Sequence, residues 1–316
     1  MVDPLAFLLG FFRPEGPDVP ELDEALGRAV SLVDSRLPQA RGWPKRYRRP
    51  IAAALEQAGH VAGAIPGPVR LDAESFQFDP LVHALFASTQ QMQEVIRDSQ
   101  AIRDYVAAGG KGEAYLLLTA HRQERQVFGV DDEGGVLRRD VPQRLVWFSD
   151  HQLAGPAPTL AEARNRLTWT LFDRFLERVR VGFERIKQEK ERLGFEKERA
   201  FDRLRRAKGE ERPALQKALD SVLAQLGETI ETLELNHLHE VFETILSHPK
   251  DCLYVEEQAL ILDRMNRVRT QARGEATVSV GFLDIIERYR EPRTAVLVYC
   301  QDIQQIANGE GRLRVT

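Results

Sequence analysis

The residues between 41 and 49 form the densest group able to do chemistry, because five cations alternate there with two aromatic rings. Cations that contact phosphates and rings that stack on bases are combined in single-stranded nucleic acid sites. The segment therefore predicts a nucleic-acid-binding site made of Arg41, Trp43, Lys45, Arg46, Tyr47, Arg48 and Arg49. The alternative is a basic lead-in to a helix with acidic neighbours, which the net charge of -4 favours.

A metal site would need more ligands than the sequence gathers in one place. Glu234 and His237 have the Glu-x-x-His spacing that puts both side chains on one helix face. Carboxylate-bridged metal bundles need a second such pair and two further carboxylates, and the sequence holds no second pair. We therefore expect no metal and no cofactor.

Nucleophilic catalysis is suggested only by residue types. Ser149, Asp150 and His151 are adjacent, and neighbouring side chains on a strand point to opposite faces, so these three cannot form a relay among themselves. Cys252 and Cys300 lie in apolar runs, where a buried inert thiol is expected. No phosphate loop or dinucleotide fingerprint occurs. We assign no catalytic residue, although an enzyme that gathers His121, Asp150 or His151 with distant groups is one alternative.

The elements that must position these groups begin with helices. Apolar residues recur at helical spacing over residues 22–37, 51–61 and 92–106, and the last run stops at Gly109. Four apolar runs then predict an antiparallel β meander, at residues 114–120, 126–130, 136–139 and 144–148.

A long helical hairpin follows, most simply a two-stranded antiparallel coiled coil. Thr159 and Glu162 form a capping box, and a heptad runs from Trp169 onward. Gly209 and Pro213 indicate a turn, after which the pattern resumes. The predicted interface comprises Phe172, Leu176, Val179, Phe183, Ile186, Leu193, Leu204, Leu215, Leu219, Val222, Leu226 and Leu233. A first arm of roughly 70 Å, at about 1.5 Å per residue, is expected to project into solvent.

The sequence thus predicts an α+β fold. Its parts are a mainly helical segment at residues 1–110, an antiparallel β meander at 111–158, the hairpin arm at 159–248 and a β-containing segment at 249–316. Strand signals recur at residues 252–255, 259–262, 276–282, 294–299 and 313–315. The simplest arrangement inserts the arm between two parts of one sheet domain.

Composition narrows the location. Two cysteines without a disulfide framework favour a reducing compartment, so a cytoplasmic protein is expected. The apolar run at residues 5–12 is shorter than the ~20 residues of a spanning helix, so no transmembrane segment is predicted.

Three functions fit these observations. The leading hypothesis is a non-catalytic interaction or scaffold protein, whose arm serves self-association or binds a protein partner. The alternative is a nucleic-acid-binding or nucleic-acid-processing protein that uses residues 41–49. The third is an enzyme built from scattered carboxylates and histidines.

Overall fold

The computed structural model describes residues 19–133, 136–209, 211–232, 238–269, 277–301 and 303–304. The chain divides into two compact units. A helical unit comprises residues 1–58 and 170–249, and a sheet unit comprises residues 59–169 and 250–316. The divisions at residues 58 and 170 fall inside two long helices, α3 (Lys45–Ala64) and α8 (Leu160–Arg206), so each helix contributes to both units.

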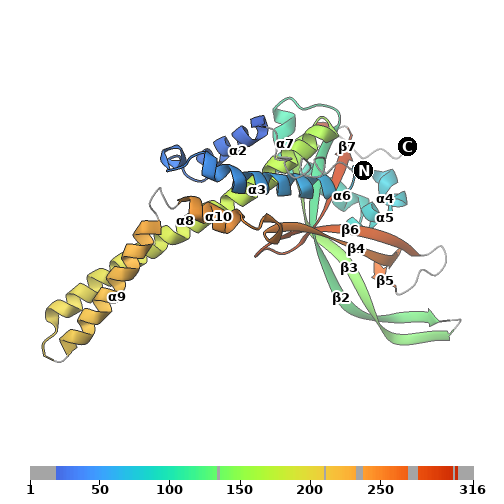
Figure 1. Cartoon of the computed structure of the whole chain (residues 1–316). Coiled ribbons are helices and arrows are strands. Elements are labelled where there is room, and N and C mark those ends of the chain that lie inside the picture. Colours follow the sequence, from blue (N-terminus) through green and yellow to red (C-terminus); the bar gives the residue numbers. More distant parts are fainter. Residues whose placement is uncertain are drawn as a thin grey trace, which may run out of the picture. The chain divides into compact units, whose positions relative to one another are not determined.

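The described strands of the sheet unit all belong to one seven-stranded sheet, in the order β1-β7-β2-β3-β5-β4-β6. Its largest part is the antiparallel hairpin of β2 (Ala114–Glu133) and β3 (Val136–Ala157), drawn in green in Figure 1. The remaining strands are β1 (Val69–Arg70), β4 (Leu253–Asp263), β5 (Arg267–Val268), β6 (Thr277–Glu287) and β7 (Arg293–Cys300). An additional pairing of β6 with β7 closes this order on itself.

The core of the sheet unit lies between the inner face of the sheet and a set of short helices. These helices are α4 (Ala73–Phe78), α5 (Pro80–Leu85), α6 (Thr89–Arg97) and α7 (Gln100–Ala107). Leu116, Leu118 and Ala120 alternate along β2 and are buried in one apolar cluster with Met92 and Ile96 of α6. Because side chains on a strand alternate between faces, Leu117 and Thr119 face away from this cluster.

Two elements of the sheet unit differ from those predicted from the sequence. The single helix expected over residues 92–106 is two helices, α6 and α7, because the Ser99 hydroxyl caps α7 by accepting a hydrogen bond from the backbone N–H of Ile102. The predicted meander is one hairpin, because register shifts near residues 119–121 and 129–131 let the strands continue where turns were expected.

The helix expected over residues 51–61 is also longer, since α3 begins at Lys45 and holds Pro50 inside it. Proline removes one backbone donor and disturbs a helix interior, so the sequence predicted that the helix would begin at Pro50 and not extend before it. The basic residues 45–49 are therefore the first turns of α3 and not a loop before it.

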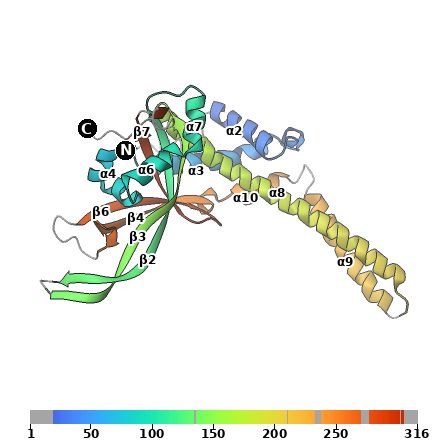
Figure 2. The same cartoon turned by 180° about the vertical axis from the view of Figure 1, so that it is seen from behind.

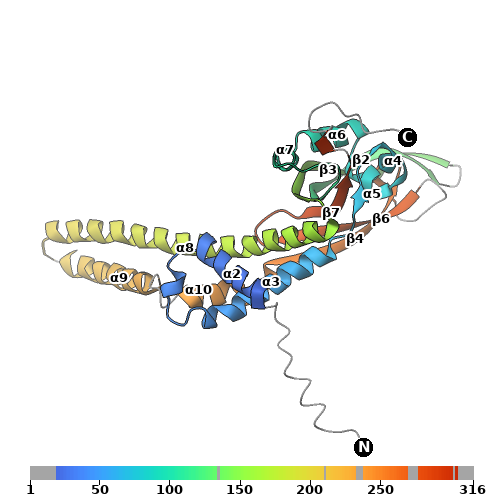
Figure 3. The same cartoon turned by 90° about the horizontal axis from the view of Figure 1, so that it is seen from above.

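The helical unit contains α2 (Val19–Leu32), the first part of α3, most of α8, α9 (Glu211–Thr232) and α10 (Leu238–Leu246). Thr159 caps α8, because its hydroxyl accepts a hydrogen bond from the N–H of Glu162 at 3.2 Å. Gly209, three residues after the end of α8, has φ of +70°, a left-handed conformation that suits glycine in the turn between α8 and α9. In the views of Figures 1 to 3, α9 runs back beside the C-terminal half of α8.

The protein is therefore α+β, and strands on both sides of the helices in sequence pair in one sheet. Among the residues that the structure describes, no helix has the length and apolar character needed to cross a membrane. The strand expected at residues 313–315 and the interface residue Leu233 lie outside the described residues.

Candidate interaction surface

The first part of α8 within the helical unit is packed by aromatic side chains. Phe172, Phe175 and Phe183 are buried. The ring of Phe183 lies 6.2 Å from that of Phe242 on α10, and Phe242 lies 5.3 Å from Tyr47 on α3, edge to face. Such aromatic contacts stabilise a core beyond the area that they bury. These contacts tie α3 and α10 to the same stretch of α8.

Polar and close backbone contacts complete this packing. Arg28 of α2 donates two hydrogen bonds to the Asp173 carboxylate of α8, at 2.7 and 3.0 Å. A Cβ atom at Gly182 would stand 2.7 Å from the Cδ1 of Ile245, so glycine lets α10 approach α8 closely. Residues 171–183 of α8 are therefore surrounded by α2, α3 and α10.

Beyond residue 183 the burial changes. Among the predicted interface residues, Phe172, Leu176, Val179 and Phe183 are buried, and the ring of Phe183 lies against Phe242 of α10. Farther along, Leu193 and Leu219 are the buried ones among the interface residues that the structure describes. The others are partly exposed: Ile186, Leu204, Leu215, Val222 and Leu226. The pairing of α8 with α9 thus buries few of the apolar side chains along the predicted interface.

The solvated surface of α8 carries the expected ion pairs at helical spacing. Lys187 lies 2.9 Å from Glu184, and Arg192 contacts Glu189 at 2.5 Å and also Glu196. Pairs of this kind on an exposed helix add little stability each. They mark the part of the hairpin that is built to face water.

Large apolar side chains outside the predicted line are exposed on the same two helices. Exposed fractions are 72 % for Phe195, 42 % for Phe201, 40 % for Leu223 and 41 % for Ile230. The heptad pattern passed over these residues because it counts only the positions that face the second helix. A search for apolar residues that directly follow the facing heptad positions in the sequence would have found Phe201, Leu223 and Ile230.

In the basic segment, residues 41–49, most cations are exposed and the two aromatic side chains are partly or fully buried. Arg41, Lys45, Arg46 and Arg49 are exposed, and within the described chain they have no ion-pair partner, whereas Arg48 donates to Asp23 at 2.6 Å. Trp43 is half-buried and lies 4.9 Å from the ring of Tyr47. Tyr47 is fully buried, so its ring does not offer the free face that base stacking needs.

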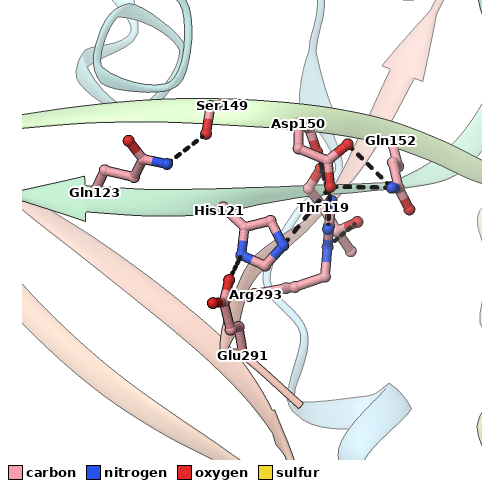
Figure 4. Close-up of polar contacts among 8 residues, drawn as sticks. All are labelled: Thr119, His121, Gln123, Ser149, Asp150, Gln152, Glu291 and Arg293. Atoms are coloured by element: carbon pink, nitrogen blue, oxygen red, sulfur yellow. Dashed lines mark hydrogen bonds and ion pairs between the residues drawn. The ribbon is translucent and has the colours of Figure 1, made fainter.

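A polar cluster on the sheet gathers two of the candidate catalytic residues (Figure 4). Arg293 of β7 donates to the Asp150 carboxylate at 2.6 Å and to the Thr119 hydroxyl at 3.1 Å, which joins β7, β3 and β2. His121 lies 3.6 Å from Asp150 and 3.6 Å from Glu291, on opposite nitrogens of its ring. No local pattern pointed to Arg293, because the cluster forms only through the pairing of β2 with β7.

The chemistry of this cluster fits a clamp between strands better than a catalytic centre. Hydrogen bonds from Arg293 lower the pKa of Asp150, so this carboxylate stays ionised and is a poor proton donor. His151 lies elsewhere, with Nε2 2.7 Å from the Leu85 carbonyl oxygen and its ring stacked on Phe86. The Ser149 hydroxyl instead accepts a hydrogen bond from Gln123. The three adjacent residues thus have three separate environments.

Other reactive groups are buried or dispersed. Burial raises the pKa of the Cys300 thiol to about 12, which keeps it protonated and unreactive, and Cys252 is buried as well. Within the described ranges, no group of three or more histidine, cysteine, aspartate or glutamate side chains is arranged to hold a metal ion. Glu234 and His237 lie outside those ranges.

Comparison with protein-family models, with curated proteins and with solved structures finds no match to this chain. The functional argument therefore rests on the geometry of the chain itself.

Proposed function

We propose that the protein is a non-catalytic cytoplasmic interaction protein that binds a protein partner, or a second copy of itself, through the hairpin of α8 and α9. One observation carries the proposal: beyond residue 183 the hairpin exposes Phe195, Phe201, Leu223 and Ile230, whereas the buried apolar side chains described there are Leu193 and Leu219. Exposed apolar side chains gathered on one element commonly mark an interaction surface. A coiled-coil interface between the two helices would be consistent with their heptads.

The hairpin also has the chemistry of a reversible binding surface. Lys190 and Lys197 occupy positions in the predicted interface where apolar residues would pack better. Polar residues at such positions weaken an interface and select its partner. A hairpin that is only moderately stable on its own gains stability when a further helix covers it.

The test is to shorten the hairpin without disturbing the packed part of the unit. Residues 194–225 are replaced by a Gly-Asn-Gly turn, which keeps Leu193 and Leu226 as the last facing residues. Proteins that co-purify with tagged full-length and shortened chains are compared, together with the mass of each chain in solution. The proposal expects the shortened chain to lose a partner or to change its oligomeric state. Unchanged partners and unchanged mass would contradict it.

Nucleic acid binding by the basic segment is a second candidate, supported by the placement of its cations. Lys45, Arg46 and Arg49 stand in the first turns of α3, where the positive end of the helix dipole disfavours cations, and no acidic residue accompanies them there. A bound phosphate backbone would offset this repulsion.

This candidate is tested by replacing Arg46 and Arg49 with alanine. Retention on single-stranded RNA or DNA should fall, and the dependence of the affinity on salt should become less steep. Arg36→Ala is the matched control, because Arg36 already pairs with Asp34 at 2.7 Å and its removal should leave retention unchanged. Equal retention by both variants would count against nucleic acid binding.

A further inference from the structure

The two flanks of the hairpin differ in chemistry. On α8, Gly194 follows the interface residue Leu193 by one position, and Phe201 follows Ala200, which holds the same heptad position one heptad later. On α9, Leu223 follows the interface residue Val222 in the same way, and Ile230 follows Thr229, one heptad after Val222. Because the helices are antiparallel, residues displaced by the same step from the facing positions lie on the same side of the pair. These four residues are called the apolar flank, and Lys187 and Gln216 stand at its polar ends.

The opposite flank is polar. The residues that precede the facing positions by one step include Glu189, Glu196, Arg203 and Gln225, which we call the charged flank. Glu189 and Glu196 both contact Arg192, so this side is already satisfied by ion pairs within α8. A helix that packs against the hairpin would therefore remove apolar surface from water on one side only.

The apolar flank can also accept close approach of another helix. A Cβ atom added at Gly194 would meet nothing within 4 Å, so open space lies beside this glycine. Phe201 stands one heptad, about two helical turns, farther along the same flank of α8 and supplies a large side chain there. Small and large residues in alternation are what interdigitating helices need.

Charge indicates what covers this flank. Residues 187–206 of α8 contain eight basic and five acidic residues, whereas residues 211–232 of α9 contain two basic and four acidic ones. A helix that packs on α9 should therefore be basic, and one that packs on α8 should be acidic. The chain itself provides both helices. A two-fold axis parallel to the hairpin would put each α8 on the α9 of the other copy, with all neighbouring helices antiparallel.

We propose that the apolar flank is a self-association surface and that two copies of this chain pair their hairpins into a four-helix bundle. This inference rests on the proposed interaction function and specifies its partner as a second copy. Phe201, Leu223 and Ile230 form the centre of the interface, and the opposite net charges of α8 and α9 set its orientation.

The experiment measures the mass of the full-length chain in solution by sedimentation equilibrium over a range of concentrations. The test variant carries Phe201→Ser, Leu223→Ser and Ile230→Ser. The matched control carries Glu196→Ser, Arg203→Ser and Gln225→Ser on the charged flank, which leaves the net charge of α8 unchanged. Circular dichroism of each variant establishes that the helices are retained, and Leu223→Ser alone is the milder variant to use if the triple variant loses helix.

The expected result is a dimer for the native chain and the control, with a dissociation constant at least about tenfold higher for the test variant. Added salt should weaken the dimer, because its orientation depends on opposite charges. A native chain that stays monomeric, or a test variant that dimerises as tightly as the native chain, would overturn the proposal. If shortening the hairpin removes a partner while the flank variant keeps it, the interaction function stands and only the self-association surface is wrong.

Discussion

The two halves of α8 within the helical unit follow the same heptad but have different surroundings. Residues 171–183 are enclosed by α2, α3 and α10, and Phe172, Leu176 and Val179 are completely buried there. Beyond residue 183 the helix has α9 beside it, and Leu193 is the buried facing residue on its side. An apolar periodicity therefore predicts which face of a helix is buried, but not how completely the rest of the fold buries it.

The largest expected effect tests the enclosed half. Phe172→Ala should lower the free energy of unfolding by about 3–5 kcal/mol, because the side chain is fully buried and its removal leaves a cavity. Denaturation by urea, followed by circular dichroism, measures this change. A loss below about 1 kcal/mol would mean that the enclosure of this half is much looser than the structure shows.

Leu193→Ala applies the same truncation to the other half. Leu193 is 1 % exposed, but few helices surround it and the site can relax, so a loss of about 2 kcal/mol is expected, at the low end for buried leucine. Leu176→Ala in the enclosed half is the matched control, measured in the same urea titration. If Leu193→Ala cost more than Leu176→Ala, the proposed contrast between the halves would be reversed.

Tyr47 of α3 sharpens the comparison, because the helices that enclose the first half of α8 contain a polar atom that lacks a partner in the described chain. The Tyr47 hydroxyl is buried without a hydrogen-bond partner in the described chain, so Tyr47→Phe should raise the free energy of unfolding by about 1 kcal/mol. Burial also raises the pKa of Tyr47 to about 12 from its ordinary value of 10. The folded state then holds its proton longer than the unfolded state does, so stability is full below pH 10 and falls as the pH rises toward 12.

The same variant checks this pH dependence. Urea titrations between pH 9 and pH 11.5 should show a steeper loss of stability in the native chain than in Tyr47→Phe. Equal slopes would show that the hydroxyl ionises as easily in the folded chain as in the unfolded one.

The smallest effect is expected at the exposed Phe195. With 72 % of its surface exposed, Phe195→Ser should change the free energy of unfolding of the monomer by no more than about 0.5 kcal/mol. Thermal denaturation at low protein concentration measures it, with Phe172→Ser as the buried counterpart. A large loss would show that Phe195 is covered by another part of the chain.

Local pattern was sufficient wherever neighbouring residues decide the structure. The N-cap at Thr159, the left-handed Gly209 and the helix α8 between them follow from side-chain chemistry within a few residues. Alternation along a strand predicted that Ser149, Asp150 and His151 would be separated, but regular alternation is not the reason for their three environments. Asp150 has φ of +50° at the register shift opposite residues 119–121, where alternation along β3 is interrupted. The boundaries of α3 and α6 were not predictable, because Pro50 and Ser99 can each either begin or interrupt a helix.

Contacts between distant segments came only from the tertiary structure. Tyr47 was expected to stack on a base, but α10 buries its ring, and no local signal in residues 41–49 indicates a helix nearly two hundred residues later. Arg293 joins Asp150 and Thr119 only because β7 pairs with β2. The sequence by itself determined the periodicities, the caps and the charges of this protein. The tertiary structure decided which apolar faces are covered, because burial depends on what the rest of the chain brings to each face.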